Sequence, residues 1–307
     1  MDRRYRDTIA LLLDVAPFVF ARPGFAMKGG TAINLFLREM PRLSVDIDLV
    51  FVDPAAPERD AALAAIENAL SQVAQTLKER LRLQVQRTTS GSANETKLFI
   101  SRGDTRVKVE VNHVFRGTVY PTVERGLTPQ AEELFSREVV VPMLAPDELY
   151  ASKLVAALDR QHPRDLFDVM LLYDNGGITP RMRRAFVVYL AGHNRPMHEL
   201  LPPRQQDVRE PFASEFVGMT AQAVGIEQLE ATRERLFAEV PTALDEAERK
   251  FLVSMHQLEP EWDLLGIPGV ERLPALRWKI LNLERLKQQN RPKFDEMSGA
   301  LAERLGF

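Results

Sequence analysis

Residues 28–51 read KGGTAINLFLREMPRLSVDIDLVF, and the order of patterns in this stretch decides the fold. A short apolar segment at 24–27 predicts a strand, and the Gly29-Gly30 pair after it predicts a sharp turn. Apolar residues spaced three and four apart then predict a helix over 31–40. Over 44–52, apolar residues alternate with polar ones in the period-two pattern of a half-buried strand. The stretch therefore predicts strand, glycine turn, helix and strand in that order.

Together with this stretch, the patterns in the rest of the chain predict an α+β protein. Over residues 1–140 we expect helices flanking a small mixed sheet, with a hairpin whose arms are 97–101 and 105–112. From Pro146 onward the periodicity is helical, so residues 141–307 are expected to form a mainly helical second domain.

Composition excludes several classes of protein. The 307 residues contain no cysteine, which excludes disulfides, thiolate catalysis and cysteine-bound zinc, and the five histidines form no HxxxH pair. The net charge of -3 provides no overall attraction to nucleic acid. The apolar stretch 9–20 superficially resembles a signal peptide, but its helical spacing favours an amphipathic helix. No run is long enough to cross a bilayer, and we expect a cytoplasmic protein without membrane contact.

Two carboxylates in the second strand are the first candidates for chemistry. Strand alternation places Asp46 and Asp48 on one face, about 6.5 Å apart along the backbone, while their apolar neighbours face the core. Two negative charges this close favour a bound cation, and Mg²⁺ takes oxygen ligands and bridges to substrate phosphates. The alternative for a lone acidic pair of this kind is a solvated strand face.

The glycine turn before the helix suits a phosphate group. Gly29 and Gly30 allow close approach of the backbone, the helix start presents N–H groups, and Thr31 offers a hydroxyl donor. A glycine pair alone is more often only a turn. The turn, one helix and a strand bearing two acids, taken in that order, favour a triphosphate site instead.

This arrangement resembles the DNA polymerase β-like nucleotidyltransferase superfamily. More narrowly, residues 28–51 closely resemble the opening motif of the AbiEii/AbiGii toxin family, the nucleotidyltransferase components of type IV toxin–antitoxin and phage-defence systems, which also includes the mycobacterial MenT toxins. The superfamily usually adds a third carboxylate on a neighbouring strand. Glu110, on the polar face of residues 107–112, is the candidate for it, as a metal ligand or general base. The alternative is an exposed strand glutamate, and the superfamily more commonly has aspartate there.

A second stretch resembles the later motifs of the same toxin family. Residues 147–160 read DELYASKLVAALDR, and residues 164–168 read RDLFD. In the family the corresponding lysine contacts nucleotide phosphates and the following aspartate is required for activity. The resemblance assigns these roles to Lys153 and Asp165, with Asp168 as a weaker candidate. Alternatively, Lys153 extends to solvent, and Asp165 caps its helix or pairs with Arg160.

These resemblances imply a metal-dependent transfer of a nucleoside monophosphate from a nucleoside triphosphate to an acceptor. The expected cofactor is Mg²⁺ or Mn²⁺, the expected acceptor the tRNA 3′ end, and the expected partner a cognate antitoxin that relieves growth arrest. Residues 1–140 would form the catalytic domain, and residues 141–307 would contribute Lys153 and Asp165 and bind the acceptor. The expected nucleotide-binding residues are Lys28, Gly29, Gly30, Thr31, Ser44 and Lys153.

Three other functions fit parts of the pattern. A nucleotidyltransferase could act on a small molecule or a protein; a non-catalytic module could bind nucleotide or RNA without turnover; and a metal-dependent phosphoesterase could use the same acids. The intact acids and Lys153 argue against the second, and the glycine turn before Asp46 argues against the third. The basic amphipathic stretch 273–283 could track RNA, with Trp278 stacking on a base, although packing through its apolar stripe is favoured.

Overall fold

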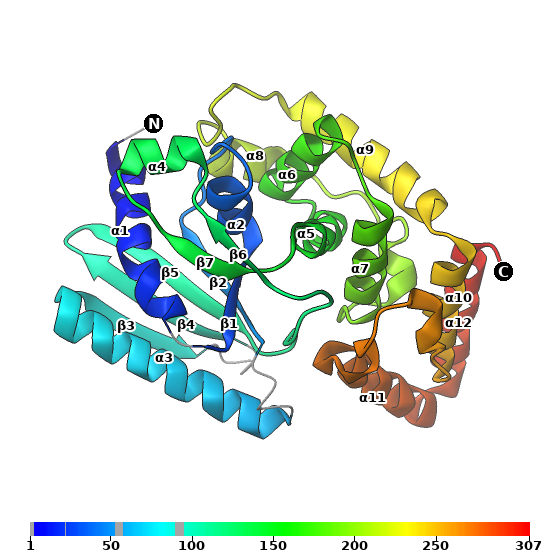
Figure 1. Cartoon of the computed structure of the whole chain (residues 1–307). Coiled ribbons are helices and arrows are strands. Elements are labelled where there is room, and N and C mark those ends of the chain that lie inside the picture. The colour runs from blue at the N-terminus through cyan, green and yellow to red at the C-terminus, as the bar shows by residue number, and fades with distance from the viewer. Residues whose placement is uncertain (1–2, 22, 53–57, 90–94) are drawn as a thin grey trace. The chain divides into compact units, whose positions relative to one another are not determined.

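The computed structural model describes residues 3–21, 23–52, 58–89 and 95–307 (Figure 1). Its contacts divide the chain into two compact units. The first is Met1–Leu149 together with Gly218–Gln222, and the second is Tyr150–Val217 together with Ala223–Phe307.

A seven-stranded mixed sheet forms the centre of the first unit, in the order β3-β4-β5-β2-β1-β7-β6. Strand β2 lies inside this sheet, parallel to β5 and antiparallel to β1. Because β2 has a paired strand on each side, its residues are held in a defined register. The side chains of one face of β2 are buried in the core. The strands are β1 (Phe25–Lys28), β2 (Asp46–Phe51), β3 (Gln84–Thr89), β4 (Glu95–Arg102), β5 (Thr105–Asn112), β6 (Val123–Gly126) and β7 (Val140–Met143).

Helices complete the core of this unit. Helix α1 packs against α3 and against strands β5, β7, β1 and β2 (Figure 1). Ile47 and Leu49 of β2 and Val109 of β5 are fully buried, as their alternation with polar residues predicts. The helices are α1 (Arg3–Phe20), α2 (Gly29–Phe36), α3 (Arg59–Leu81) and α4 (Pro129–Phe135).

Helix α2 is shorter than its apolar spacing predicts, because it ends at Phe36 and not near Met40. The N–H groups of Leu37 and Arg38 both bond to the carbonyl of Ile33, which closes the helix. Met40 then adopts a positive φ of 47° immediately before Pro41. Proline disfavours helical geometry at the residue before it, so the helical pattern cannot continue through this point.

Strands β6 and β7 have no counterpart in the sequence prediction. Both are four residues long, and Pro142 interrupts the donor pattern of β7. Strand β7 pairs in parallel with β1, where Met27 lies opposite Met143. The contacts therefore place β7 in the first unit, whereas the predicted domain boundary lies at residue 140.

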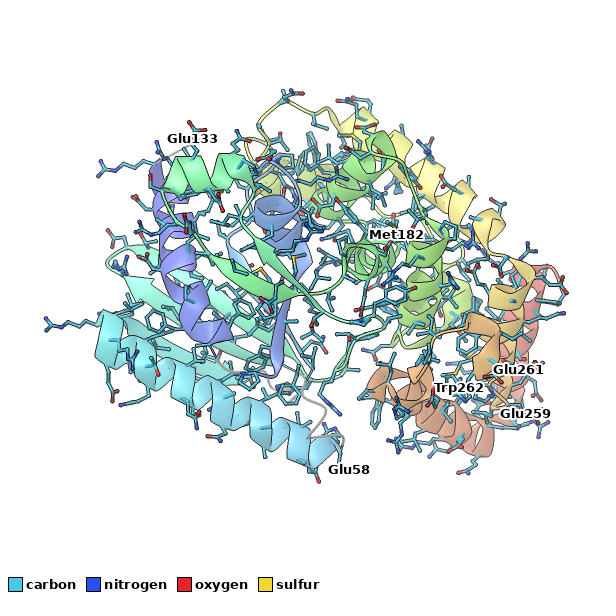
Figure 2. The ribbon with its side chains drawn as sticks, viewed as in Figure 1. Glu58, Glu133, Met182, Glu259, Glu261 and Trp262 are labelled. Atoms are coloured by element: carbon cyan, nitrogen blue, oxygen red, sulfur yellow. The ribbon has the colours of Figure 1, made fainter. Side chains whose placement is uncertain are left out.

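The second unit is helical, and its residues contain no strand. Trp262 of η2, which is labelled in Figure 2, packs against Phe251 of α10, and their ring centroids are 5.7 Å apart. No described helix of the chain is long and apolar enough to span a membrane. An α+β fold with a mixed sheet followed by helices is thus confirmed. The elements are α5 (Pro146–Arg160, beginning in the first unit), α6 (Pro163–Asp174), α7 (Pro180–Ala191), η1 (Met197–Leu200), α8 (Arg209–Glu215), α9 (Ile226–Ala243), α10 (Glu246–Gln257), η2 (Trp262–Leu265), η3 (Val270–Arg272), α11 (Pro274–Gln289) and α12 (Arg291–Leu305).

Candidate active site

The carboxylates of β2 lie on one face of the sheet in the first unit. Asp46 and Asp48 alternate with the buried Ile47, so both side chains are on the face opposite the core. In the register with β5, Asp48 lies opposite Glu110. In the register with β1, Asp48 lies opposite Lys28. The expected meeting of three carboxylates on neighbouring strands is thus present in the sheet.

The ionised form of Asp48 is disfavoured in the protein without a bound cation. Burial raises the pKa of Asp48; the positive charge of Lys28 opposes this rise, and the negative charge of Asp46 adds to it. A raised carboxyl pKa means that the ionised form is disfavoured by its surroundings. Paired oxygen donors in such surroundings fit a hard divalent cation that prefers oxygen ligands.

The glycine turn brings the start of α2 against Asp48. Gly29 has a φ of +79°, and a Cβ at this position would lie 2.2 Å from Oδ2 of Asp48. A Cβ on Gly30 would lie 2.5 Å from Nη2 of Arg42 and 2.9 Å from Oγ of Ser44. The N-cap residue of α2, Lys28, makes no side-chain cap hydrogen bond. Only glycine therefore permits this approach of the helix start to the carboxylate.

Substitution of Gly29 by alanine is expected to lower both stability and activity. The left-handed backbone should cost about 1–2 kcal/mol of unfolding free energy, and the added methyl group must displace the Asp48 carboxylate. Gly103→Ala is the matched control, because Gly103 also has a positive φ of 58° but nothing lies within 4 Å of its Cβ position. Gly29→Ala should lose more unfolding free energy in urea than Gly103→Ala does, and its rate of nucleotide transfer should fall further. Equal transfer rates in the two variants would contradict the importance of this contact.

Thr31 and Ser44 lie at the base of this turn. The buried hydroxyl of Thr31 donates to the main-chain carbonyl of Asp46 at 2.5 Å and lies 3.0 Å from Oγ of Ser44. This bond ties the start of β2 to α2. Nucleotide binding by Thr31 and Ser44 stays a prediction.

Sequence reasoning did not single out Asn34, which also holds the turn in place. Its side-chain amide donates to the carbonyl of Gly30 at 2.8 Å, and its Oδ1 accepts from the main-chain N–H of Arg42 at 3.3 Å. Asn34 is fully buried. The sequence contains one sign of this role. Asn34 is a polar residue one helical turn after Gly30 in a short apolar helix, and a buried polar side chain needs hydrogen-bond partners.

Two lysines that sequence reasoning did not assign surround Glu110. Nζ of Lys108 lies 3.0 Å from Oε2 of Glu110 and 3.3 Å from Oδ2 of Asp46. Nζ of Lys97, on β4 opposite Glu110, lies 3.5 Å from the same glutamate oxygen. Burial by itself raises the pKa of Glu110. The hydrogen bonds and positive charges of Lys108 and Lys97 outweigh this effect and hold the pKa of Glu110 below its usual range. Glu110 is thus ionised and paired with two cations.

The second predicted motif forms a buried charge cluster within the second unit. Nζ of Lys153 lies 2.7 Å from Oδ1 of Asp165 and 3.1 Å from Oδ2 of Asp168. The exposed fractions of these side chains are 8%, 3% and 0%. Arg160 adds a contact from Nε to Oδ2 of Asp165 at 2.8 Å. Burial opposes ionisation of Asp165, yet the charges of Lys153 and Arg160 hold its pKa well below the ordinary value.

These contacts decide between the alternatives for this motif. Lys153 does not extend to solvent, because its ammonium lies among buried carboxylates. Asp165 is not the helix cap: Nδ1 of His162 accepts from the N–H of Arg164 at the start of α6. The predicted pairing of Asp165 with Arg160 is present. The assigned roles of Lys153 in phosphate contact and of Asp165 in activity stay predictions.

The basic stretch 273–283 comprises the N-cap residue Leu273 and the part of α11 from Pro274 to Leu283. Leu276 and Leu283 are buried, and Trp278 is 43% exposed. Lys279 is buried as well, and its Nζ donates to the carbonyls of His193 and Arg195 at 2.8 Å each. Burial lowers the pKa of Lys279 to about 8. The favoured interpretation, packing through an apolar stripe, is thus confirmed, and RNA binding stays a prediction.

Comparisons with known proteins agree with this geometry. A family model described as nucleotidyl transferase AbiEii toxin, type IV TA system, matches residues 10–280. Among solved structures, the MenT4 nucleotidyltransferase toxin from Mycobacterium tuberculosis H37Rv has a similar fold, with a TM-score of 0.57 and 20% sequence identity. The alignment covers 89% of this chain and 93% of that chain. The search of curated proteins found no match.

The family model covers most of the chain and includes all the predicted site residues. The sheet with its paired aspartates, the glycine turn and the helical unit as far as the first part of α11 lie within the matched range. The chain therefore belongs to the AbiEii family of nucleotidyltransferase toxins of type IV toxin–antitoxin systems.

Proposed function

We propose that this nucleotidyltransferase transfers a nucleoside monophosphate from a nucleoside triphosphate to an acceptor hydroxyl, with a divalent cation, Mg²⁺ or Mn²⁺, held by Asp46 and Asp48. The contact between Gly29 and Asp48 is the observation that carries this proposal. It joins the start of a helix, where N–H groups face outward, to a carboxylate pair that favours a cation. A triphosphate with its cation requires both features side by side.

The chain's own residues supply positioning and charge. The acceptor hydroxyl attacks the α-phosphorus and its proton passes to water as the new P–O bond forms; the bond between the α-phosphorus and the oxygen that bridges to the β-phosphate breaks, and pyrophosphate leaves. Main-chain N–H groups at Gly29 and Gly30 bind the departing phosphates, and Lys28 adds a positive charge beside Asp48. When bound, the cation neutralises charge on the triphosphate oxygens. By family resemblance, Lys153 contacts the nucleotide phosphates and Asp165 is required for activity.

The acceptor and the biological role follow from the same resemblance. By family analogy we propose the 3′ end of tRNA as acceptor, because its terminal hydroxyl can attack the α-phosphorus. Loss of usable tRNA would arrest growth in the cytoplasm, including during phage infection, and a cognate antitoxin would relieve the arrest. The exposed Trp278 of α11 offers a surface on which an unpaired base of the acceptor can stack.

The test is incubation of the full chain with Mg²⁺, total tRNA and each α-labelled nucleoside triphosphate in turn. Label in tRNA with one nucleotide, together with released pyrophosphate, is the expected result and names the substrate. Label in protein or in a small molecule, with tRNA unlabelled, would retain the chemistry and reject the tRNA acceptor. Release of phosphate without label transfer would indicate a phosphoesterase and reject the proposal.

A further inference from the structure

A cavity in the second unit shares no residue with the predicted nucleotide site. It measures about 130 Å³ and lies between the turn that follows α7, helix α11 and helix α12. Asn194 lines it from the turn, Trp278, Asn282 and Leu286 line it from α11, and Met297 lines it from α12. Helix α11 packs against both α7 and α12 (Figure 1). The cavity is therefore built by the helical unit alone.

A buried lysine fixes the wall of this cavity. Lys279 lines it from α11, and its Nζ donates to the carbonyls of His193 and Arg195 at 2.8 Å each. These bonds tie α11 to the turn after α7, so the two walls are held at a fixed spacing. No described carboxylate forms an ion pair with the ammonium, and Glu199 supports its charge from a greater distance. The wall thus carries a positive charge that attracts electron-rich groups.

Three other side chains of the cavity are suited to a flat ring with polar edges. The indole of Trp278 lines the cavity, although the residue is 43% exposed. The carboxamides of Asn194 and Asn282 line it too, and neither forms a side-chain hydrogen bond within the described part of the chain. A carboxamide offers two N–H donors and one acceptor oxygen. Unpaired nucleobases stack on aromatic side chains and form hydrogen bonds through their edges, so this set of side chains favours a nucleobase.

The size of the cavity favours a base over a whole nucleotide. Sites for drug-sized ligands usually enclose about 300–1,000 Å³, whereas this cavity encloses about 130 Å³. One ring system can therefore enter, while the sugar and the phosphates attached to it stay outside.

Exposed cations on α11 suit the phosphates of a strand. The helix carries four basic side chains and one acidic side chain, although the whole chain has a net charge of -3. Arg277 and Arg285 are exposed, and neither forms an ion pair with a described carboxylate. Arg285 follows Trp278 by two helical turns and lies on the same face of α11. A base at Trp278 would thus have a basic surface beside it for the neighbouring phosphates of single-stranded RNA.

We propose that the cavity between α7 and α11 binds an unpaired base of the acceptor RNA: Trp278 stacks on the base, and Asn194 and Asn282 form hydrogen bonds with its edge. Arg285 contacts a phosphate of the same strand. This inference rests on the proposed function, because it takes RNA as the acceptor. It goes beyond that function by naming where the second unit holds RNA, through residues that take no part in binding the nucleoside triphosphate.

The first test is the fluorescence of Trp278 in the full chain. The chain contains two tryptophans, so Trp262→Phe leaves Trp278 as the single emitter. Titration with a short single-stranded RNA is expected to quench this emission, because the base stacks on the indole. An RNA of the same length without bases keeps the phosphates and should leave the emission unchanged. Equal quenching by the two RNAs would overturn the inference.

Two other occupants of the cavity have their own signatures in this titration. Quenching by a free nucleoside monophosphate at the same concentration as by RNA would assign the cavity to a nucleotide and overturn the acceptor assignment. A change of emission with protein concentration alone would indicate contact between copies of the chain, and this outcome too would overturn it.

Substitutions at the cavity connect it to the reaction. Trp278→Ala should raise the KM for tRNA in label transfer, and the Kd for fluorescently labelled RNA, by about tenfold. Trp278→Phe keeps an aromatic ring and should change both by less than about threefold. Leu281→Ala is the matched control, because Leu281 is a 53% exposed apolar residue of the same helix that does not line the cavity. Equal KM values for Trp278→Ala and Leu281→Ala would contradict the proposal.

A second variant covers the case in which Trp278→Ala folds poorly. Asn282→Ala should weaken binding of the RNA with bases and leave binding of the RNA without bases as it was, because the amide contacts only the base. Arg285→Gln should weaken binding of both RNAs, because it removes a phosphate contact. Equal effects of Asn282→Ala on the two RNAs would reject the contact with the base.

These measurements also separate this inference from the proposed function. Label transfer to tRNA without quenching of Trp278 by RNA would reject the cavity and leave the proposed function in place. Quenching by RNA without label transfer to tRNA would reject the proposed acceptor reaction and retain the cavity as a site for an RNA base.

Discussion

Asp48→Asn is expected to reduce nucleotide transfer by about three orders of magnitude, because it removes one of two carboxylates that hold the cation. The folded protein should remain as stable as the original or become more stable. Burial and the charge of Asp46 raise the pKa of Asp48, so the ionised side chain costs free energy in the protein alone, and the neutral amide avoids this cost. Loss of activity with retained or increased melting temperature is the signature of a functional charge. Label transfer and thermal unfolding measure the two effects.

Asp104→Asn is the matched control for this substitution. Asp104 is an exposed aspartate of the same unit, in the turn between β4 and β5, and the exchange is chemically identical. We expect transfer and stability close to those of the unaltered protein. Comparable activity in Asp48→Asn and Asp104→Asn would refute the assignment of the site to β2. Asp46→Asn should behave as Asp48→Asn does in the transfer assay.

Lys153→Met is expected to destabilise the protein by about 3–5 kcal/mol, because it leaves two buried carboxylates without their shared cation. The ammonium of Lys153 contacts Asp165 and Asp168, whose side chains are almost fully buried. Methionine has a similar length but offers neither charge nor a donor, so the carboxylates must take up protons or draw in water. Urea unfolding at neutral pH measures the loss.

Two further variants test the cause of this loss. Adding Asp168→Asn to Lys153→Met removes a buried carboxylate that has lost its ion pair with Lys153 and should recover part of the stability, while Arg160 continues to pair with Asp165. Lys250→Met is the matched control, because Lys250 pairs with Glu246 on an exposed helix face and its loss should change the unfolding free energy little. Equal destabilisation by Lys153→Met and Lys250→Met would show that the buried cluster contributes no special stability.

Local patterns in the sequence determined the individual elements and the faces of the strands. The hairpin arms of β4 and β5 lie where the alternation predicts them, and the chain from Pro146 onward is helical as its spacing predicts. Alternation also placed Asp46, Asp48 and Glu110 on the polar faces of their strands. These features depend on side chains a few residues apart, so the periodicity of one segment suffices to predict them.

The tertiary structure alone decided which of these faces and charges meet. The parallel pairing of β2 with β5 brings Lys108 to Asp46, and no local pattern specifies this register. Residues 218–222 join the first unit through the bond from the N–H of Leu43 to the carbonyl of Met219, across a long sequence separation. Sequence periodicity reports which side of an element is apolar, but the partner across that side depends on the packing of segments that are distant in the chain.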